Sequence, residues 1–314
     1  MTSAKPIIEV KNFVKKYGNF TAVDDISFTV DEGNIFAFLG PNGAGKSTTI
    51  NTLCTIFDKT EGELIIDGYN VSTQKAQVRS TIGVVFQDST LDKKMTIEEN
   101  LKMHCVFYKV PKHEVDERIK FVLTLVDLLS VRKKTVAALS GGMKRRVEIA
   151  RGLIHYPKVL FLDEPTTGLD PQTRAYVWDY VVRLQKEKNI TIFLTTHYMD
   201  EAEICDKVAV IDHGRIIAHD SPFELKRQFT KDRAYVTTAN PPALEGLLND
   251  KGINFTVKEK YHRIDVDNNS ALLSVLSECK NDITDIEIRK GTLNDVFLEI
   301  TGREIREVEN NESD

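Results

Sequence analysis

Residues 35–48 read Ile-Phe-Ala-Phe-Leu-Gly40-Pro41-Asn42-Gly43-Ala44-Gly45-Lys46-Ser47-Thr48. The five apolar residues at the start are typical of a strand that is buried on both faces of a parallel sheet. The next eight fit the phosphate-loop pattern G-x-x-x-x-G-K-[ST], in which backbone N–H groups curl around phosphate oxygens. In such a loop Lys46 reaches the β- and γ-phosphates and the Ser47 hydroxyl ligates Mg²⁺, and a helix starts behind it. This stretch predicts a nucleotide-binding α/β fold.

A second apolar run, Val159–Leu162, leads directly into two carboxylates, Asp163 and Glu164. Because α/β sheets bind their ligands at the carboxyl ends of the strands, these acids are expected beside the phosphate loop. There Asp163 would hold Mg²⁺ through water, and Glu164 would polarise the attacking water as a general base. A strand end with solvated acids is common in itself, so the assignment depends on the phosphate loop.

Short apolar runs alternate with amphipathic segments as far as about residue 220. The expected strands are Ile7–Val10, Ile35–Leu39, Leu64–Asp67, Ile82–Phe86, Val159–Asp163, Thr191–Thr195 and Val208–Ile211. Between the fourth and fifth strands, apolar residues recur at helical spacing from Val115 to Leu129. We therefore expect a domain of residues 1–229 with a mostly parallel sheet and an inserted helical subdomain at about 88–151.

The pattern changes after residue 229. Strands and helices are expected in the order βαββαβα, which is that of a ferredoxin-like α+β unit with one added helix. The added helix, Thr292–Ile300, has Thr292 as its expected N-cap. This predicts a small accessory domain at 230–302, and residues 303–314 are polar enough to form a mobile tail.

Composition limits the possible partners and compartments. The 314 residues include 47 acidic and 42 basic side chains, so no basic excess favours nucleic acid as a partner. The four cysteines are far apart, with neither metal-site nor disulfide spacing, which favours a reducing compartment. We found no secretory signal and no run near the ~18 apolar residues of a membrane span, so a cytoplasmic chain without direct membrane insertion is expected.

One further motif narrows the fold to a family. Together with the two motifs above, Leu139-Ser140-Gly141-Gly142-Met143 closely resembles the signature of ABC-type ATPases. The other landmarks of that family have matches in the same order: Tyr17 for the adenine-stacking aromatic, Gln87 for the Q-loop, Gly168-Leu169-Asp170 for the D-loop and His197 for the switch histidine. The resemblance covers residues 5 to 225. Met143 stands where glutamine is usual, at a position that is not expected to touch phosphate.

The resemblance implies a P-loop NTPase core of the ABC type, which is a mostly parallel sheet with flanking helices, an antiparallel β part and an inserted helical subdomain. It also implies a head-to-tail dimer that sandwiches two ATP molecules. The second subunit is a second copy or another ATPase subunit. Each ATP would touch the phosphate loop of one subunit and Ser140 and Gly142 of the other. Both residues stand at an expected helix start, where free N–H groups face an anion. Asp170 would couple the two sites across the interface.

The same resemblance assigns the remaining chemical roles. His197 would hydrogen-bond the γ-phosphate and hold Glu164 and the attacking water in line. Gln87 would contribute to Mg²⁺ binding, together with Ser47 and Asp163, and would report its occupancy to the helical subdomain.

The closing segment points to a subfamily. Residues Gly291–Gly302 and the run Gly141–Arg146 resemble drug-resistance ATP-binding subunits of the daunorubicin type. Those subunits serve separate ABC-2-type membrane permeases that export drugs, lipids or other amphiphiles. The resemblance therefore implies an energy-coupling subunit that is cytoplasmic and peripheral on the inner face of the cell membrane. Residues Asp88–Leu101 are expected to form the groove that receives the permease.

Two alternatives stay open. A soluble ABC ATPase in translation, repair or cofactor assembly would share the motifs, but this chain has one ATPase domain, no heptads and no CxxC pair. A small P-loop kinase or GTPase would leave residues 139–143 unexplained. A membrane permease that accompanies the chain would distinguish the exporter from both of these alternatives.

Overall fold

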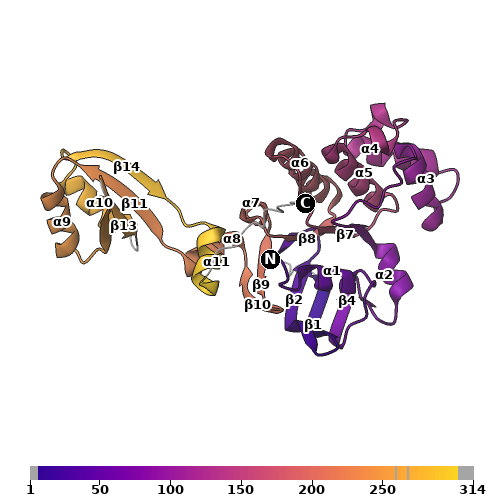
Figure 1. Ribbon diagram of the computed structural model, residues 1–314, viewed down its shortest axis with the longest axis horizontal. Coiled ribbons are helices and arrows are strands. Elements are labelled where there is room, and N and C mark those ends of the chain that lie inside the picture. The colour runs from indigo at the N-terminus through magenta and orange to yellow at the C-terminus, as the bar shows by residue number, and fades with distance from the viewer. Residues whose placement is uncertain (1–5, 259, 267–268, 303–314) are drawn as a thin grey trace, which may run out of the picture. The chain divides into compact units, whose positions relative to one another are not determined.

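The chain folds as two compact units, residues 1–221 and 222–314, in the computed structural model (Figure 1). The structure describes residues 6–258, 260–266 and 269–302, so the expected tail at 303–314 lies outside the described residues. The boundary differs from the expected one at residue 229. The reason is that α8 (Pro222–Phe229) packs against α11 (Leu293–Thr301), which closes the second unit.

A six-stranded sheet forms the centre of the first unit. Its order is β10 (Arg215–Asp220), β9 (Lys207–Asp212), β3 (Ile35–Leu39), β8 (Thr191–Thr196), β7 (Val159–Asp163) and β6 (Ile82–Val85). The five strands from β9 to β6 are parallel, and β10 is antiparallel at one edge. Every residue of β3, β7 and β8 is buried, which confirms that these apolar runs are covered on both faces.

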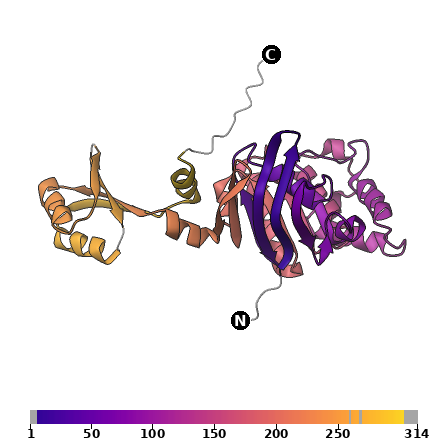
Figure 2. The same cartoon turned by 90° about the horizontal axis from the view of Figure 1, so that it is seen from below.

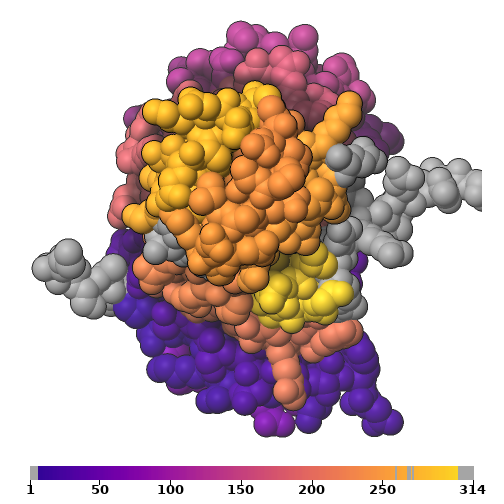
Figure 3. All heavy atoms as spheres, turned by 90° about the vertical axis from the view of Figure 1, so that its left-hand side faces the viewer, coloured from indigo at the N-terminus to yellow at the C-terminus, as the bar shows by residue number. Residues whose placement is uncertain are grey.

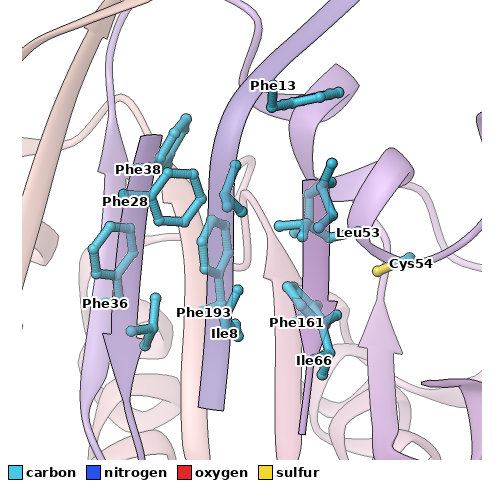
Figure 4. Packing of buried hydrophobic residues seen from close by; sticks show 14 of the residues in the cluster. Ile8, Phe13, Phe28, Phe36, Phe38, Leu53, Cys54, Ile66, Phe161 and Phe193 are labelled. Carbon is cyan, nitrogen blue, oxygen red and sulfur yellow. The ribbon is translucent and has the colours of Figure 1, made fainter. Parts of the chain in front are cut away.

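A second, antiparallel sheet has the order β2 (Phe20–Asp31), β1 (Pro6–Tyr17), β4 (Glu61–Ile66) and β5 (Tyr69–Asn70), and its long indigo strands stand out in Figure 2. Phe28 of β2 joins the two sheets, because its ring lies 5.4 Å from that of Phe36 and 5.2 Å from that of Phe38 (Figure 4). Strand β2 was not predicted, because Asp24 and Asp25 interrupt its apolar alternation, and Asp25 has a positive φ of 51°.

Helices complete the first unit. Its inserted helical part contains α3 (Ile97–Phe107), α4 (Val115–Leu125) and α5 (Gly141–Leu153), with short 3₁₀ turns η1 (Leu129–Val131) and η2 (Val136–Ala138). The expected stripe is buried at Ile119, Val122 and Leu123. The remaining helices are α1 (Lys46–Leu53), α2 (Lys75–Thr81), α6 (Pro171–Lys188) and α7 (Met199–Ala202).

The second unit has the predicted ferredoxin-like order. Its sheet is β12 (Phe255–Lys258), β13 (Tyr261–Val266), β11 (Asp232–Thr238) and β14 (Ile283–Arg289), with all neighbours antiparallel. Helices α9 (Pro241–Asp250) and α10 (Asn269–Glu278) bury one face of this sheet, and Figure 3 shows the unit in orange and yellow. Thr292 caps α11 as predicted, in a capping box with Asp295. Among the described residues, we find no helix long and apolar enough to span a membrane.

Because the first unit closes its own core, we expect a chain that ends at Ser221 to fold by itself. Size-exclusion chromatography and near-UV circular dichroism would then show a compact protein with its buried phenylalanines still ordered. A chain cut after Asp212, which lacks edge strand β10, is the matched control and should lose stability. Aggregation of the 1–221 chain would show instead that the two units share a core.

Candidate nucleotide site

The phosphate loop connects β3 to α1, and its backbone needs glycine at two points. Gly45 has a φ of 104°, which side chains other than glycine rarely adopt. At Gly40 an added Cβ would lie 2.2 Å from the carbonyl oxygen of Ile211. These positions keep the loop tightly curled at the end of β3, with its N–H groups available to an anion.

Lys46 lies buried at the inner end of this loop. Its Nζ donates hydrogen bonds to the carbonyl oxygens of Gly40 (2.7 Å) and Pro41 (3.1 Å), and lies 3.3 Å from Glu164 Oε1. Burial lowers the pKa of Lys46, and the charge of Glu164 partly offsets that effect. The ammonium is therefore fixed at the point where a phosphate held by the loop would meet it.

The two predicted acids lie at the end of β7, as expected. Asp163 Oδ1 accepts hydrogen bonds from Ser47 Oγ (3.3 Å) and Thr195 Oγ1 (2.5 Å). Burial raises the pKa of Asp163, while the Thr195 bond lowers it. The role of Thr195 was not predicted, although its place at the end of β8, opposite Asp163 in the parallel register, could have indicated it.

Glu164 is held from three sides in a left-handed backbone conformation, with φ at 43°. Its Oε2 lies 3.4 Å from His197 Nδ1 and accepts a hydrogen bond from Thr167 Oγ1 (3.2 Å), and its N–H donates to Thr195 Oγ1 (3.0 Å). Burial alone would raise the pKa of Glu164, but the bond to His197 and the charge of Lys46 lower it to about 2. The carboxylate is thus ionised at neutral pH.

A cavity of about 470 Å³ joins these groups. It is lined by Tyr17, Phe20, Ala22, Pro41, Asn42, Gly43, Gly45, Lys46, Ser47, Thr48, Gln87 and Glu164. Tyr17 therefore lies on the same cavity as the phosphate loop, with Lys15 Nζ 4.7 Å from its ring centre. Phe20, which is 65% exposed, and Ala22 were not anticipated from the sequence, because they belong to the unforeseen strand β2. Of the predicted catalytic residues, Glu164 and Gln87 line the cavity, whereas Asp163 contacts Ser47 and His197 lies beside Glu164.

The signature residues lie elsewhere. Ser140 is the N-cap of α5 and accepts a hydrogen bond from the Met143 N–H (3.3 Å), and both Ser140 and Gly141 are exposed. Gly142, which was expected to touch the other subunit's ATP, is buried, and an added Cβ there would lie 2.2 Å from Thr173 Cγ2. Of residues 139–143, none is among the described residues that line the cavity. The D-loop lies beside them, since a Cβ at Gly141 would be 3.6 Å from Leu169 Cδ2 and Asp170 caps the adjacent helix α6.

Arg145 is a residue of the site that sequence analysis missed. From α5 its buried guanidinium donates to the carbonyl oxygens of Asp163 (3.1 Å), Pro165 (2.6 Å) and Phe86 (2.5 Å), and to Glu148 Oε2 (3.0 Å). It therefore connects the signature helix to the end of β7 and to the residue before Gln87. A basic residue two positions beyond the signature gives no local signal for such contacts.

The donor set fits Mg²⁺. Ser47 Oγ, Asp163 and the Gln87 amide oxygen are hard oxygen donors, which this ion prefers. The described residues contain no group of three or more His, Cys, Asp and Glu side chains that could hold a metal alone. Mg²⁺ in nucleotide sites commonly takes one or two protein carboxylates and completes its shell with phosphates and water.

Comparison with known proteins gives two family matches. The family described as ABC transporter matches residues 23–167, and the ATP-binding protein DrrA1-3-like C-terminal domain matches residues 221–301. Daunorubicin resistance ATP-binding protein DrrA3 of Streptomyces coeruleorubidus is 35% identical over 311 residues, which cover 96% of this chain and 98% of DrrA3.

Two further proteins extend the comparison. The probable multidrug ABC transporter ATP-binding protein YbhF of Escherichia coli is 37% identical over 231 residues, which cover 74% of this chain but 40% of YbhF. A dimeric post-hydrolysis structure of the ATP-binding cassette MJ0796 with ADP and Pi matches at a TM-score of 0.62 and 27% identity. That match covers 68% of this chain and 98% of MJ0796.

We expect Arg145→Ala to destabilise the first unit by about 3 kcal/mol, because it leaves Glu148 and several buried carbonyl groups without their donor. Urea unfolding measures the change. Lys144→Ala removes the same charge from a half-buried neighbour on α5 and serves as the control. Equal stability of the two variants would contradict the role given to Arg145.

Proposed function

The chain belongs to the ATP-binding proteins of ABC transporters, and on that premise we propose that it is the energy-coupling subunit of an exporter. It would hydrolyse ATP with Mg²⁺ to move drugs, lipids or other amphiphiles through a separate ABC-2-type permease. The observation that carries the ATPase proposal is one cavity that joins the phosphate loop, Glu164 and Gln87. The exporter proposal is supported by the DrrA-like C-terminal match and by the likeness to DrrA3 over nearly the whole chain.

In this proposal the cavity binds the whole nucleotide. Tyr17 and Phe20 offer aromatic surface to the adenine, and the loop N–H groups with Lys46 hold the β- and γ-phosphates. Bound Mg²⁺ would supply charge neutralisation between the phosphates. Ser47, Asp163 and Gln87 are the residues that would hold it.

Glu164 is proposed to orient and polarise the attacking water. A carboxylate with a pKa of about 2 is a weak base, so its low pKa has to change before it can accept a proton. Part of that lowering comes from Lys46, whose ammonium a γ-phosphate attracts in competition with Glu164. Phosphate binding would thereby raise the basicity of Glu164 at the step that needs it, while His197 keeps it in line.

We further propose a head-to-tail dimer, with a second copy or another ATPase subunit. Ser140 and Gly141 are exposed at the start of α5, where N–H groups can reach the nucleotide of another subunit. Asp170 is exposed at the neighbouring start of α6, in a position to couple the two sites. The likeness to the dimeric MJ0796 structure supports this arrangement.

The proposed permease-docking groove lies between α3 and the sheet. It has a volume of about 410 Å³, and residues from α2, α3, β6 and α5 line it. Phe86 contributes to it directly before Gln87, and Phe107 on α3 leaves 65% of its surface exposed. The expected docking stretch Asp88–Leu101 contributes Thr90, so most of the groove comes from neighbouring elements. Docking here would place the chain on the inner face of the cell membrane.

Glu164→Gln should retain ATP binding and lose ATP turnover, because the amide keeps the shape of the side chain but cannot accept the water's proton. We expect the bound ATP to trap a dimer, which light scattering in ATP and Mg²⁺ would detect. Glu187→Gln, an exposed neutralisation on α6, should behave as the unaltered protein. A Glu164→Gln protein that is monomeric and fully active would rule out the assigned role.

Purification of the full chain from its native membranes in mild detergent tests the exporter proposal. A polytopic permease is expected to accompany it, and Phe107→Asp should reduce that association without loss of ATP hydrolysis. Leu273→Asp, an equally exposed apolar position in the second unit, is the control. Copurification with soluble partners alone would instead favour an ABC ATPase of translation, repair or cofactor assembly.

A further inference from the structure

Strand β14 is an open edge of the second unit's sheet. It pairs with β11 on one side, and no described strand pairs with its other side (Figure 1). The N–H of Ile286 donates to Asp285 Oδ1 (2.9 Å), which is a local substitute for a ladder partner. A strand of seven residues with a free edge is a template for pairing with another chain.

The two faces of β14 differ in chemistry. Ile286 and Ile288 are in register with Val236 and Ala234 of β11, so they belong to the face that α9 and α10 cover. The helices nevertheless leave Ile286 41% and Ile288 55% exposed, whereas Val236 and Ala234 are buried. The edge thus presents unpaired backbone groups and an uncovered apolar stripe side by side.

The opposite face of β14 carries three charged side chains, two acidic and one basic. Asp285, Glu287 and Arg289 lie on it, as shown by Arg289, whose guanidinium lies 4.9 Å from the ring centre of Tyr235 on β11. All three are exposed. A partner strand on this edge must therefore satisfy both an apolar stripe and a charge pattern.

We propose that β14 of a second copy of this chain pairs with it, antiparallel, about a twofold axis at Glu287. This pairing would join the two sheets into one of eight strands, with α9 and α10 of both copies on the same face. It is a contact between second units and goes beyond the proposed function.

The apolar stripe and the charge pattern together select this register. Opposite residues of antiparallel strands share a face, so the axis can pass through Ile286, Glu287 or Ile288. An axis at Ile286 places Asp285 against Glu287 of the other copy, and like charges directly opposite are destabilising. An axis at Ile288 pairs Glu287 with Arg289 twice, but it places Ile286 against Lys290 twice and so leaves half of the apolar stripe opposite charged side chains.

An axis at Glu287 places Ile286 against Ile288 twice and Asp285 against Arg289 twice. The single like pair is Glu287 with its own copy, where Arg289 of each strand already lies 2.9 Å from the carboxylate. This register also uses the free backbone groups of Ile286 and Ile288, since Ile286 directs its N–H away from β11. This register therefore pairs apolar side chains with each other, pairs opposite charges and supplies partners for the free backbone groups.

A cysteine at the axis tests the proposal in the full chain. The N–H and C=O groups of residue 287 point toward β11. Residue 287 therefore forms a non-hydrogen-bonded pair with residue 287 of the other copy, and the two Cα atoms lie about 4.5 Å apart. This separation is within the range of a disulfide. Glu287→Cys is expected to form a disulfide-linked dimer on mild oxidation, with or without ATP. The four native cysteines are buried and give little background.

Thr256→Cys, exposed on the opposite edge strand β12, is the control and should stay monomeric on a non-reducing gel. Equal cross-linking of the two variants, no cross-linking of Glu287→Cys, or cross-linking that requires ATP would each overturn the proposal. Preferential cross-linking of Ile286→Cys or Ile288→Cys would overturn the register.

A charge exchange gives a second readout that needs no oxidation. Asp285→Arg places arginine against Arg289 of the other copy at two symmetric positions, and should weaken self-association of the full chain by about tenfold in analytical ultracentrifugation. The double variant Asp285→Arg with Arg289→Asp should restore it. Unchanged association in Asp285→Arg would contradict the proposed pairing. Neither experiment requires ATP hydrolysis or a permease, so failure of the proposed function would not affect the result.

Discussion

The structure of the first unit depends on a buried ammonium and two buried carboxylates at one edge of a parallel sheet. Lys46, Asp163 and Glu164 are all less than 10% exposed, and charges removed from water need partners with good geometry. The partners come from every neighbouring segment: loop carbonyls hold Lys46, Thr195 holds Asp163, and His197 lies beside Glu164. The parallel order of β3, β8 and β7 is what brings these segments to the same edge.

Local pattern was enough to predict the strands that build this edge and the residues that project from it. The runs that become β3, β7 and β8 each contain at least three consecutive apolar residues, and each strand is followed at once by a residue of the site. Thr195 and Arg145 escaped prediction for a physical reason. Their roles depend on which strand or helix lies beside which, and neither stands in a local pattern that differs from an ordinary threonine or arginine.

In the second unit, the sequence predicted the order of the elements but not which residues are buried. Its element order was predicted correctly, yet the alternation of Ile283, Ile286 and Ile288 resembles a strand with a fully covered face. Ile283 packs against the core, whereas the helices do not reach the other two. Exposure at an edge is set by how far two helices extend across a sheet, and periodicity along one strand carries no information about that distance.

The buried guanidinium of Arg145 has a mechanical consequence. It hydrogen-bonds from α5 to main-chain oxygens at the end of β7 and directly before Gln87, so one side chain holds these three segments together. The exposed start of α5 is thereby connected, through one side chain, to the main chain on both sides of Glu164. In a paired assembly, a contact that shifts the start of α5 would therefore also shift the main chain that carries the catalytic carboxylate.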